Sequence, residues 1–269
     1  MGTIVVTGSA GGMGRAVRAV LNSEGHTVIG VDVADAEVEA DLSTPGGRKA
    51  MVREVDELCS SRLDGLVVAA GLQKGDAGTI VSVNYFGAVA TLEGLRPFLE
   101  ASGNASVVVV SSNSTTTMPD YPLEIAEWCL ADDEPRARNA ATEPNGAYAA
   151  SKLALALWSR RAATTHDWIE VGIRLNVIAP GVIDTPMTEG GWDFIQAISD
   201  VYPVPVGRPG TAAEAAALIR YLLSPEGAFF CGSFITMDGG TDAALRPDDW
   251  PRAPSRYPRS ARTISPCRI

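Results

Sequence analysis

The sequence has few residues of the kinds that hold metals or bind nucleic acids. Its 269 residues include only two histidines and four cysteines, and the cysteines are scattered without a C-x-x-C pair. We therefore predict no metal site and free thiols in a reducing compartment. Lys and Arg number 22, against 32 Asp and Glu. The net charge of -10 argues against a nucleic-acid partner, because phosphate binding needs clustered positive charge.

Long apolar runs and targeting signals are missing as well. No apolar run approaches the ~20 residues needed to cross a bilayer. A strand pattern begins at Thr3, which leaves no room for a signal peptide, and Val6 stands where an N-myristoylation motif needs Ser or Thr. We expect no association with a membrane and a cytoplasmic location.

Short apolar runs alternate with longer helical stretches along most of the chain. The runs are nearly continuous in apolar character, as in strands buried on both faces. They are Thr3–Thr7, Thr27–Val33, Leu66–Ala69, Val107–Val110, Gly172–Ile178 and Phe234–Met237. The helical stretches are Arg15–Ser23, Gly46–Cys59, Thr79–Leu99, Ala147–Thr164 and Ala212–Leu223. This alternation predicts an α/β fold, a single-domain Rossmann-type doubly wound parallel sheet flanked by helices.

Three segments interrupt that alternation. Asn113–Gly146 is a long polar insertion in which Pro122–Ala137 has the composition of a helix. Residues 185–205 are rich in apolar side chains and could form a mobile lid over a substrate, or pack on the sheet as an ordinary helix pair. Residues 246–269 are rich in Pro and Arg, which is typical of an irregular tail. We predict one folded domain over residues 1–245.

A glycine-rich segment, Thr7–Gly14, follows the first predicted strand and opens the first helix. Glycine permits a tight turn and lets a pyrophosphate approach the N–H groups at a helix N-terminus. Such turns can also serve packing alone, but this position favours a dinucleotide cofactor. Asp32 follows 18 residues after Gly14, where a carboxylate bonds the adenosine ribose hydroxyls and repels a 2′-phosphate. Neither Val33 nor Ala34 is charged, so the pattern predicts NAD rather than NADP.

A tyrosine and a lysine are spaced as i and i+4 in Tyr148-Ala149-Ala150-Ser151-Lys152. This spacing places both side chains on one face of a helix. A nearby ammonium favours the phenolate, so the tyrosine can act as an acid or base below its usual pKa of ~10. The same pair is common on helix surfaces. The Rossmann-type start and Ser111-Ser112 after an apolar run favour a catalytic interpretation.

Several segments, in the order in which they occur along the chain, resemble those of the classical short-chain dehydrogenase/reductase family. The nearest resemblance is to its 3α-hydroxysteroid dehydrogenase/carbonyl reductase branch. The resemblance covers Thr3 to about Gly240 and rests on TGSAGGMG, Asp32, Asp41-Leu42, Ala69-Ala70-Gly71, Asn84, Ser111-Ser112, YAASK and Pro180-Gly181. The likeness to the branch rests on DAEVEADLST, VSVNYFGA, the insertion and RLNVIAPG. It implies hydride transfer between NAD(H) and the carbinol or carbonyl carbon of a small, hydrophobic or cyclic alcohol or ketone, steroid-like or xenobiotic.

The resemblance also implies a role for each matching residue. Tyr148 would be the catalytic acid/base, and Lys152 would lower its pKa and hold the nicotinamide ribose. Ser112 would bond the substrate oxygen, and Asn84 would position a water between Lys152 and solvent. Asp41 and the Leu42 backbone would meet adenine. The remaining cofactor contacts would be Gly8, Ser9, Gly12, Met13 and Gly14 at the phosphate turn, Asp32, Ala70 and Gly71 at the adenosine ribose, and Pro180, Gly181, Ile183 and Thr185 at the nicotinamide.

The sequence departs from the family pattern at two places. The family's Asn-Asn-Ala-Gly is Val68-Ala69-Ala70-Gly71 here, so we expect backbone contacts to hold that turn. Ser112 lies 36 residues before Tyr148, farther than is usual in the family, which leaves Ser111 and Ser114 as alternatives. Two other functions stay open: a non-catalytic NAD-binding redox sensor or scaffold, and an epimerase or dehydratase of the extended family. The latter usually carries a larger C-terminal substrate domain.

Members of the family are usually homodimers or homotetramers that pair through the helices after the fourth and fifth strands. The insertion leads directly into the helix of Tyr148. It carries the apolar residues Leu123, Ile125, Trp128 and Leu130, which a surface loop rarely exposes. We expect the insertion to be ordered and to change that helix pairing. A flexible flap beside the active site is the alternative.

Overall fold

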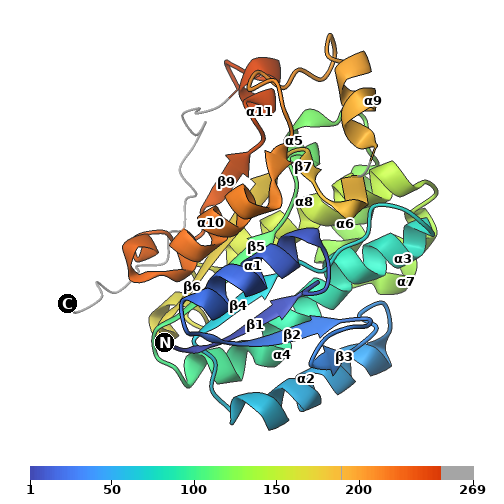
Figure 1. Ribbon diagram of the computed structural model, residues 1–269. Helices are drawn as coiled ribbons and strands as arrows, with labels where there is room; N and C mark the ends of the chain where they lie inside the picture. Colours follow the sequence, from blue (N-terminus) through green and yellow to red (C-terminus); the bar gives the residue numbers. More distant parts are fainter. Residues whose placement is uncertain (189, 250–269) are drawn as a thin grey trace, which may run out of the picture.

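The computed structural model describes residues 1–188 and 190–249 (Figure 1). Its centre is a seven-stranded sheet of parallel strand pairs in the order β3-β2-β1-β4-β5-β6-β9. The strands are β1 Thr3–Thr7, β2 Thr27–Asp32, β3 Val38–Glu39, β4 Gly65–Val68, β5 Ala105–Val110, β6 Ile173–Pro180 and β9 Phe234–Met237. A separate pair joins β7 Ile183–Asp184 to β8 Gly210–Thr211. The predicted doubly wound sheet is confirmed.

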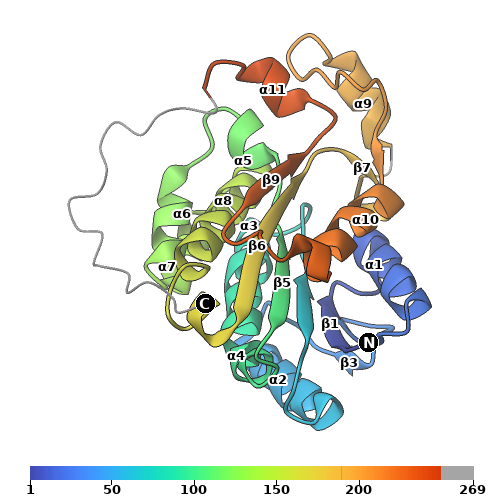
Figure 2. The same cartoon turned by 90° about the vertical axis from the view of Figure 1, so that its left-hand side faces the viewer.

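Helices cover both faces of this sheet (Figures 1 and 2). One face carries α1 Gly12–Ser23 and α10 Ala212–Leu223. The other carries α2 Pro45–Cys59, α4 Ala88–Glu100 and α8 Pro144–Ala162. The shorter helices are α3 Ala77–Val81, α5 Ser114–Thr117, α6 Leu123–Leu130, α7 Glu134–Ala140, α9 Gly191–Ala197 and α11 Thr241–Leu245, with 3-10 turns η2 Ile169–Val171, η3 Pro186–Thr188 and η4 Pro225–Gly227.

Successive residues of each central strand face opposite helix layers. On β1, Val5 packs in the cluster under α2, α4 and α8, whereas Ile4 and Val6 pack in the cluster under α1 and α10. All three are at most 3% exposed. Because both faces of the sheet are buried, its strands have the nearly continuous apolar runs seen in the sequence.

The predicted helix Thr79–Leu99 contains a π-helical segment. This segment, η1 Ser82–Gly87, lies between α3 and α4 without a break in the helical backbone. The wider turn inserts an extra residue, and such segments frequently occur at functional sites. It carries Asn84, one of the predicted site residues.

The prediction of one helix over Pro122–Ala137 is wrong, because the insertion forms α6 and α7 instead. Between them Asp132 has φ +58, and the Asp133 side chain accepts a hydrogen bond from the N–H of Arg136 to start α7. The insertion is ordered, with α6 packed on α8 and α7 packed on α3. It therefore contacts helices that follow β4 and β5, and its effect on helix pairing stays a prediction.

The predicted lid and tail differ in how much of each the structure describes. α9, in the segment of residues 185–205, has no buried residue, so it does not pack on the sheet as a core helix. α11 ends at Leu245, and residues 250–269 of the predicted tail lie outside the described residues. The domain boundary after residue 245 stays a prediction.

Within the described part of the chain, no helix is both long and apolar enough to span a bilayer.

Candidate active site

The glycine-rich turn joins β1 to α1 at the carboxyl edge of the sheet. Gly8 has φ +69, and a Cβ there would lie 2.8 Å from the Ala70 nitrogen. A Cβ on Gly14 would overlap the Gly8 carbonyl, so glycine allows α1 to begin directly against the turn. The first turn of α1 has no side-chain cap and no acidic residue. Its N–H groups therefore form a site for an anionic group.

Asp32 lies at the end of β2 and supports the same turn. Its carboxylate accepts hydrogen bonds from the N–H groups of Ala10 at 2.9 Å and Val33 at 2.7 Å. A carboxylate has about four lone-pair sites, so it keeps acceptor capacity for ribose hydroxyls.

A cavity of 660 Å³ runs along this edge of the sheet. The predicted cofactor residues that line it are Gly8, Gly12, Met13, Gly14, Asp32, Asp41, Leu42, Ala70, Gly71 and Thr185. A dinucleotide site needs a glycine turn, a helix N-terminus and an acidic ribose partner in one groove, and these residues fit that need. Ser9 does not line the cavity. Its hydroxyl is buried and has no hydrogen-bond partner among the described residues.

The turn after β4 lacks the family's Asn side chains, and a threonine holds it. The Oγ1 atom of Thr7 accepts hydrogen bonds from the N–H groups of Ala69 and Ala70, both at 3.1 Å. Thr7 is fully buried on β1, which pairs directly with β4. The turn is therefore held through its backbone N–H groups, as expected, but the acceptor is a side chain of β1.

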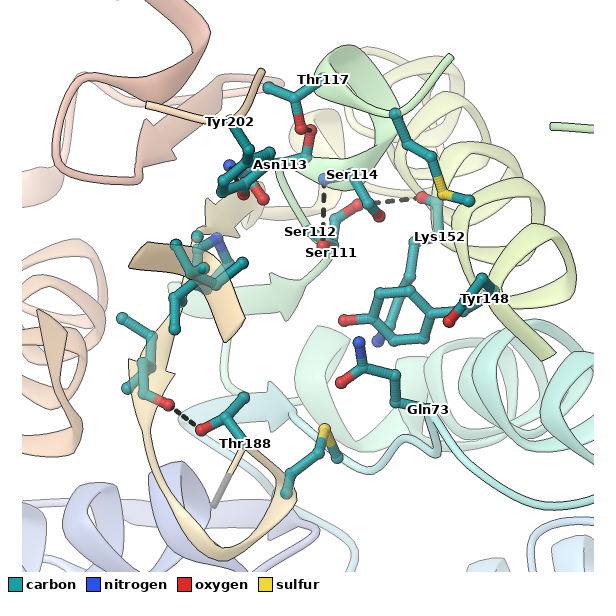
Figure 3. A pocket seen from close by; sticks show the side chains of 18 of the residues that line it. Gln73, Ser111, Ser112, Asn113, Ser114, Thr117, Tyr148, Lys152, Thr188 and Tyr202 are labelled. Carbon is teal, nitrogen blue, oxygen red and sulfur yellow. Dashed lines mark hydrogen bonds between the residues drawn. The ribbon is translucent and has the colours of Figure 1, made fainter. Parts of the chain in front are cut away.

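Tyr148 and Lys152 on α8 line a second cavity, of 480 Å³ (Figure 3). Glu143 caps the helix by accepting hydrogen bonds from the N–H groups of Asn145 and Gly146. The Ser111 hydroxyl donates to the Lys152 carbonyl at 2.9 Å. This bond fixes the middle of α8 to the end of β5.

Ser112 is the serine beside the tyrosine. It lines the cavity beside Tyr148, its Oγ accepts a hydrogen bond from the Ser114 N–H at 3.1 Å, and its side chain acts to lower the pKa of Tyr148. The Ser111 hydroxyl is already directed to the backbone of α8. The geometry therefore favours Ser112 over Ser111 as the residue that meets a substrate oxygen.

Burial is the largest influence on the pKa values of Tyr148 and Lys152 on α8. It raises the pKa of Tyr148, and the side chain of Ser112 opposes this only in part. It lowers the pKa of Lys152 to about 8, and Nζ donates to the Val110 carbonyl at 2.8 Å. Lys152 is not among the groups that shift the pKa of Tyr148, and its ammonium bonds a carbonyl of β5. The lowering of the Tyr148 pKa by Lys152 stays a prediction.

Asn84 is fully buried in the π-helix η1. Its Oδ1 accepts from the Leu72 N–H at 2.8 Å, and its Nδ2 donates to the Leu72 carbonyl at 2.9 Å and to the Ser151 hydroxyl at 3.3 Å. A Cβ on Gly71 would lie 3.2 Å from both Asn84 Oδ1 and Lys152 Nζ. Asn84 thus fixes the loop beside Lys152 without lining either cavity. Its contact with a water stays a prediction.

The two cavities are parts of one cleft. Both are lined by Met13, Ala69, Gly71, Thr185 and Met187. The predicted nicotinamide residues Pro180, Gly181 and Ile183 line the part near Tyr148. Thr188 donates its hydroxyl proton to the Ile183 carbonyl and accepts from the Thr185 N–H at 3.2 Å. Thr188 thus holds the backbone of Ile183 and Thr185, two of the residues predicted to lie at the nicotinamide.

The sequence did not predict two polar side chains of the cavity near Tyr148, those of Asn113 and Gln73, nor the bond between Asn113 and Tyr202 of the predicted lid. The Asn113 amide donates to the Tyr202 hydroxyl at 2.8 Å and to the Asp238 carboxylate at 3.4 Å. Tyr202 belongs to the segment predicted as a lid, so this bond ties that segment to the end of β5. Gln73 lines the same cavity (Figure 3). No motif marks these residues; the sole signal is the position of Asn113 directly after Ser112. Among the described residues, no cluster of His, Cys, Asp and Glu could hold a metal ion.

Comparison with known proteins finds relatives along nearly the whole chain. A family model described as "short chain dehydrogenase" matches residues 2–121, and one described as "Enoyl-(Acyl carrier protein) reductase" matches residues 136–242. A 3-alpha-hydroxysteroid dehydrogenase/carbonyl reductase of Comamonas testosteroni is 40% identical over 92% of this chain and 99% of the relative. A coniferyl-alcohol dehydrogenase of Pseudomonas sp. is 32% identical over 88% of this chain and 95% of the relative.

Solved structures show the same similarity. A 3-alpha-hydroxysteroid dehydrogenase from Pseudomonas sp. B-0831, complexed with NADH, superposes with a TM-score of 0.85 at 39% identity. The match covers 91% of this chain and 99% of the other. The chain is therefore similar to that protein in sequence and in fold over almost its full length.

Proposed function

The chain belongs to the short-chain dehydrogenase/reductase family, and on that premise we propose that it transfers hydride between NAD(H) and the carbinol or carbonyl carbon of a small hydrophobic alcohol or ketone. It is an oxidoreductase close to the hydroxysteroid dehydrogenase/carbonyl reductase members. The observation that carries the proposal is a single cleft. One part of this cleft is lined by the glycine turn and Asp32, and the other part is lined by Ser112, Tyr148 and Lys152.

The cofactor residues would act along the cleft in order. The α1 N-terminus and glycine turn would hold the pyrophosphate, Asp32 the adenosine ribose, and Asp41 and Leu42 the adenine. When bound, NAD(H) supplies or accepts the hydride. We expect NAD to be preferred over NADP, because the Asp32 carboxylate repels a 2′-phosphate and Val33 and Ala34 bring no compensating charge. Values of kcat/KM with both cofactors decide this, and equal efficiency with NADP would contradict it.

Tyr148 would move the proton. Because burial keeps its pKa above the ordinary value, the phenol is protonated at neutral pH and can donate to a carbonyl oxygen during reduction. In oxidation the phenol oxygen would take the alcohol proton instead. Ser112 would hydrogen-bond the same substrate oxygen, and Lys152 would place its positive charge near the nicotinamide ribose. Each role is supported by the position of the side chain in the cleft.

The substrate part of the cleft is mostly apolar on the side of the predicted lid. That side is lined by Met187, Phe194, Ile195, Ile198 and Val201. Phe194 is 64% exposed and Val201 is 70% exposed, so an apolar ligand that covers them gains from their burial. This supports a hydrophobic or cyclic substrate. The names of the relatives support a steroid or another carbonyl compound.

An NAD-coupled screen of steroids, cyclic alcohols and aromatic carbonyls tests the proposal. We expect at least one hydrophobic cyclic compound to change the absorbance of NADH, and a titration by NADH fluorescence measures binding separately. Binding of NADH without turnover of any compound would favour the sensor or scaffold instead.

We also infer a homodimer or homotetramer whose helix pairing differs from the usual one. The insertion already contacts α3 and α8, whereas Phe229 is fully exposed and Tyr221, on α10, is 40% exposed. Such apolar groups favour an interface. Light scattering should show an oligomer that Phe229→Asp weakens, and a monomeric wild type would contradict this.

A cytoplasmic location stays a prediction. Among the described residues, Cys59, Cys129 and Cys231 are free thiols.

A further inference from the structure

A mostly buried ion pair joins the insertion to the loop beside the cofactor cleft. The guanidinium of Arg48 on α2 bonds both carboxylate oxygens of Glu134 on α7, at 2.7 Å each. Their side chains are 10% and 20% exposed, and the residues lie 86 positions apart in the chain. Burial raises the pKa of Glu134, but hydrogen bonds from Arg48 and Ser82 more than offset this, so the pKa is lowered overall. The carboxylate is therefore charged at neutral pH.

The same guanidinium holds the backbone of the cleft wall. Its Nε donates to the Leu42 carbonyl at 2.8 Å, and Nη2 donates to the carbonyls of Ser43 at 3.2 Å and Ser82 at 3.1 Å. Leu42 and Ser43 line the 660 Å³ cavity, next to Asp41. A guanidinium that is fixed in a planar fork by a carboxylate can hold several carbonyls in one geometry.

A second arginine connects α7 to the π-helix. Arg138 donates to the Ser82 hydroxyl and, at 3.2 Å, to the Gly78 carbonyl. Ser82 is fully buried and begins η1. Arg48 and Arg138 thus bond the carbonyl and the hydroxyl of one residue. Arg138 belongs to the insertion, and Arg48 is bonded to it through Glu134. In addition, the Arg48 guanidinium lies 5.9 Å from the ring centre of Phe86 on η1.

We propose that the insertion braces the adenine end of the cofactor site, with Glu134 as a positioning residue that acts through Arg48 on the Asp41–Ser43 loop. The inference rests on the proposed NAD site. Without Glu134, the Arg48 fork loses its fixed orientation and can no longer hold the Leu42 and Ser43 carbonyls together. The adenosine half of the cofactor then meets a looser wall, whereas the nicotinamide half near Tyr148 keeps its contacts.

Ligands that contain only one half of the cofactor show whether Glu134 supports the adenosine half of the site alone or stabilises the fold in general. Glu134→Gln keeps the size of the side chain and removes its charge, and Glu127→Gln, on the exposed side of α6, is the matched control for the insertion. We expect Glu134→Gln to raise the Kd of ADP-ribose and of NADH about tenfold. The Kd of reduced nicotinamide mononucleotide, and kcat at saturating NADH, should be unchanged. Glu127→Gln should behave as wild type.

Double substitution tests the coupling of the two residues. Arg48→Lys removes the fork, so Glu134→Gln added to it should weaken ADP-ribose binding little further. If Glu134→Gln does not fold, Glu134→Asp, which keeps the charge but shortens the side chain, should weaken ADP-ribose more than reduced nicotinamide mononucleotide. Equal weakening of both ligands, or none relative to Glu127→Gln, would overturn the brace. A wild type that binds neither NADH nor ADP-ribose would instead contradict the proposed function.

Discussion

Replacement of Thr7 by valine tests whether one hydroxyl holds the turn after β4. Valine keeps the shape of threonine but removes the oxygen that accepts from the N–H groups of Ala69 and Ala70 at 3.1 Å. Thr7 is 0% exposed, so water does not replace that oxygen. Each donor left without an acceptor costs about 1–3 kcal/mol, and two donors give a loss of about 2–6 kcal/mol in the free energy of unfolding. This is a large share of the ~5–15 kcal/mol typical of a domain.

Guanidinium denaturation of the wild type and two variants measures this loss. Thr7→Ser is the control, because it keeps the hydroxyl and loses one methyl group, which costs about 1 kcal/mol. We expect the midpoint to fall much further for valine than for serine, with similar m-values. The Kd of NADH should also rise for valine, because Ala69 and Ala70 line the cofactor cleft. A valine variant as stable as the serine variant would refute the reasoning.

Two further predictions concern the chemistry. Tyr148→Phe keeps the ring but has no proton to donate, so kcat should fall about 10²-fold or more. The Kd of NADH should stay unchanged, and retained turnover would show that another group is the acid. The kcat/KM of carbonyl reduction should fall as the pH rises through about 8, because burial lowers the pKa of Lys152 to about 8 and its positive charge exists only below that value. Tyr148, whose pKa is raised, stays protonated there, so a level pH profile would contradict the role of Lys152.

The central strands were predictable because they are buried on both faces, whereas the two-residue strand β3 was not predicted. The apolar runs at Thr3–Thr7 and Phe234–Met237 coincide with β1 and β9, and the pattern over Ala212–Leu223 coincides with α10. The break between α6 and α7 was not predicted, because polar capping residues interrupt a stretch whose apolar content favours one helix. The Asp-Asp-Glu-Pro sequence of residues 132–135 ends one helix and starts the next, since Asp133 caps α7 and Pro135 fits its first turn.

Contacts between distant segments were not predictable from spacing. The i, i+4 pair of Tyr148 and Lys152 is local, so one helix brings both to the cleft. Arg48 and Glu134 meet only because α7 of the insertion packs against α3 and η1, near the start of α2. The same holds for the Thr7 hydroxyl, whose acceptor role depends on the pairing of β1 with β4. No periodicity in the sequence encodes these tertiary pairings.

Substitution of Ile125 decides whether the insertion is part of the fold or a flap on its surface. Ile125 on α6 is 0% exposed and belongs to the same apolar cluster as Leu155 on α8. Truncation to alanine leaves a cavity that the surrounding helices fill only in part, so the free energy of unfolding should fall by about 2–5 kcal/mol. Leu123 on the same helix is 57% exposed, and Leu123→Ala should change stability by less than about 0.5 kcal/mol. In a flap that opens independently, neither truncation would shift the main transition. Similar denaturation midpoints for the two variants would therefore contradict both the packing of α6 on α8 and the brace that depends on it.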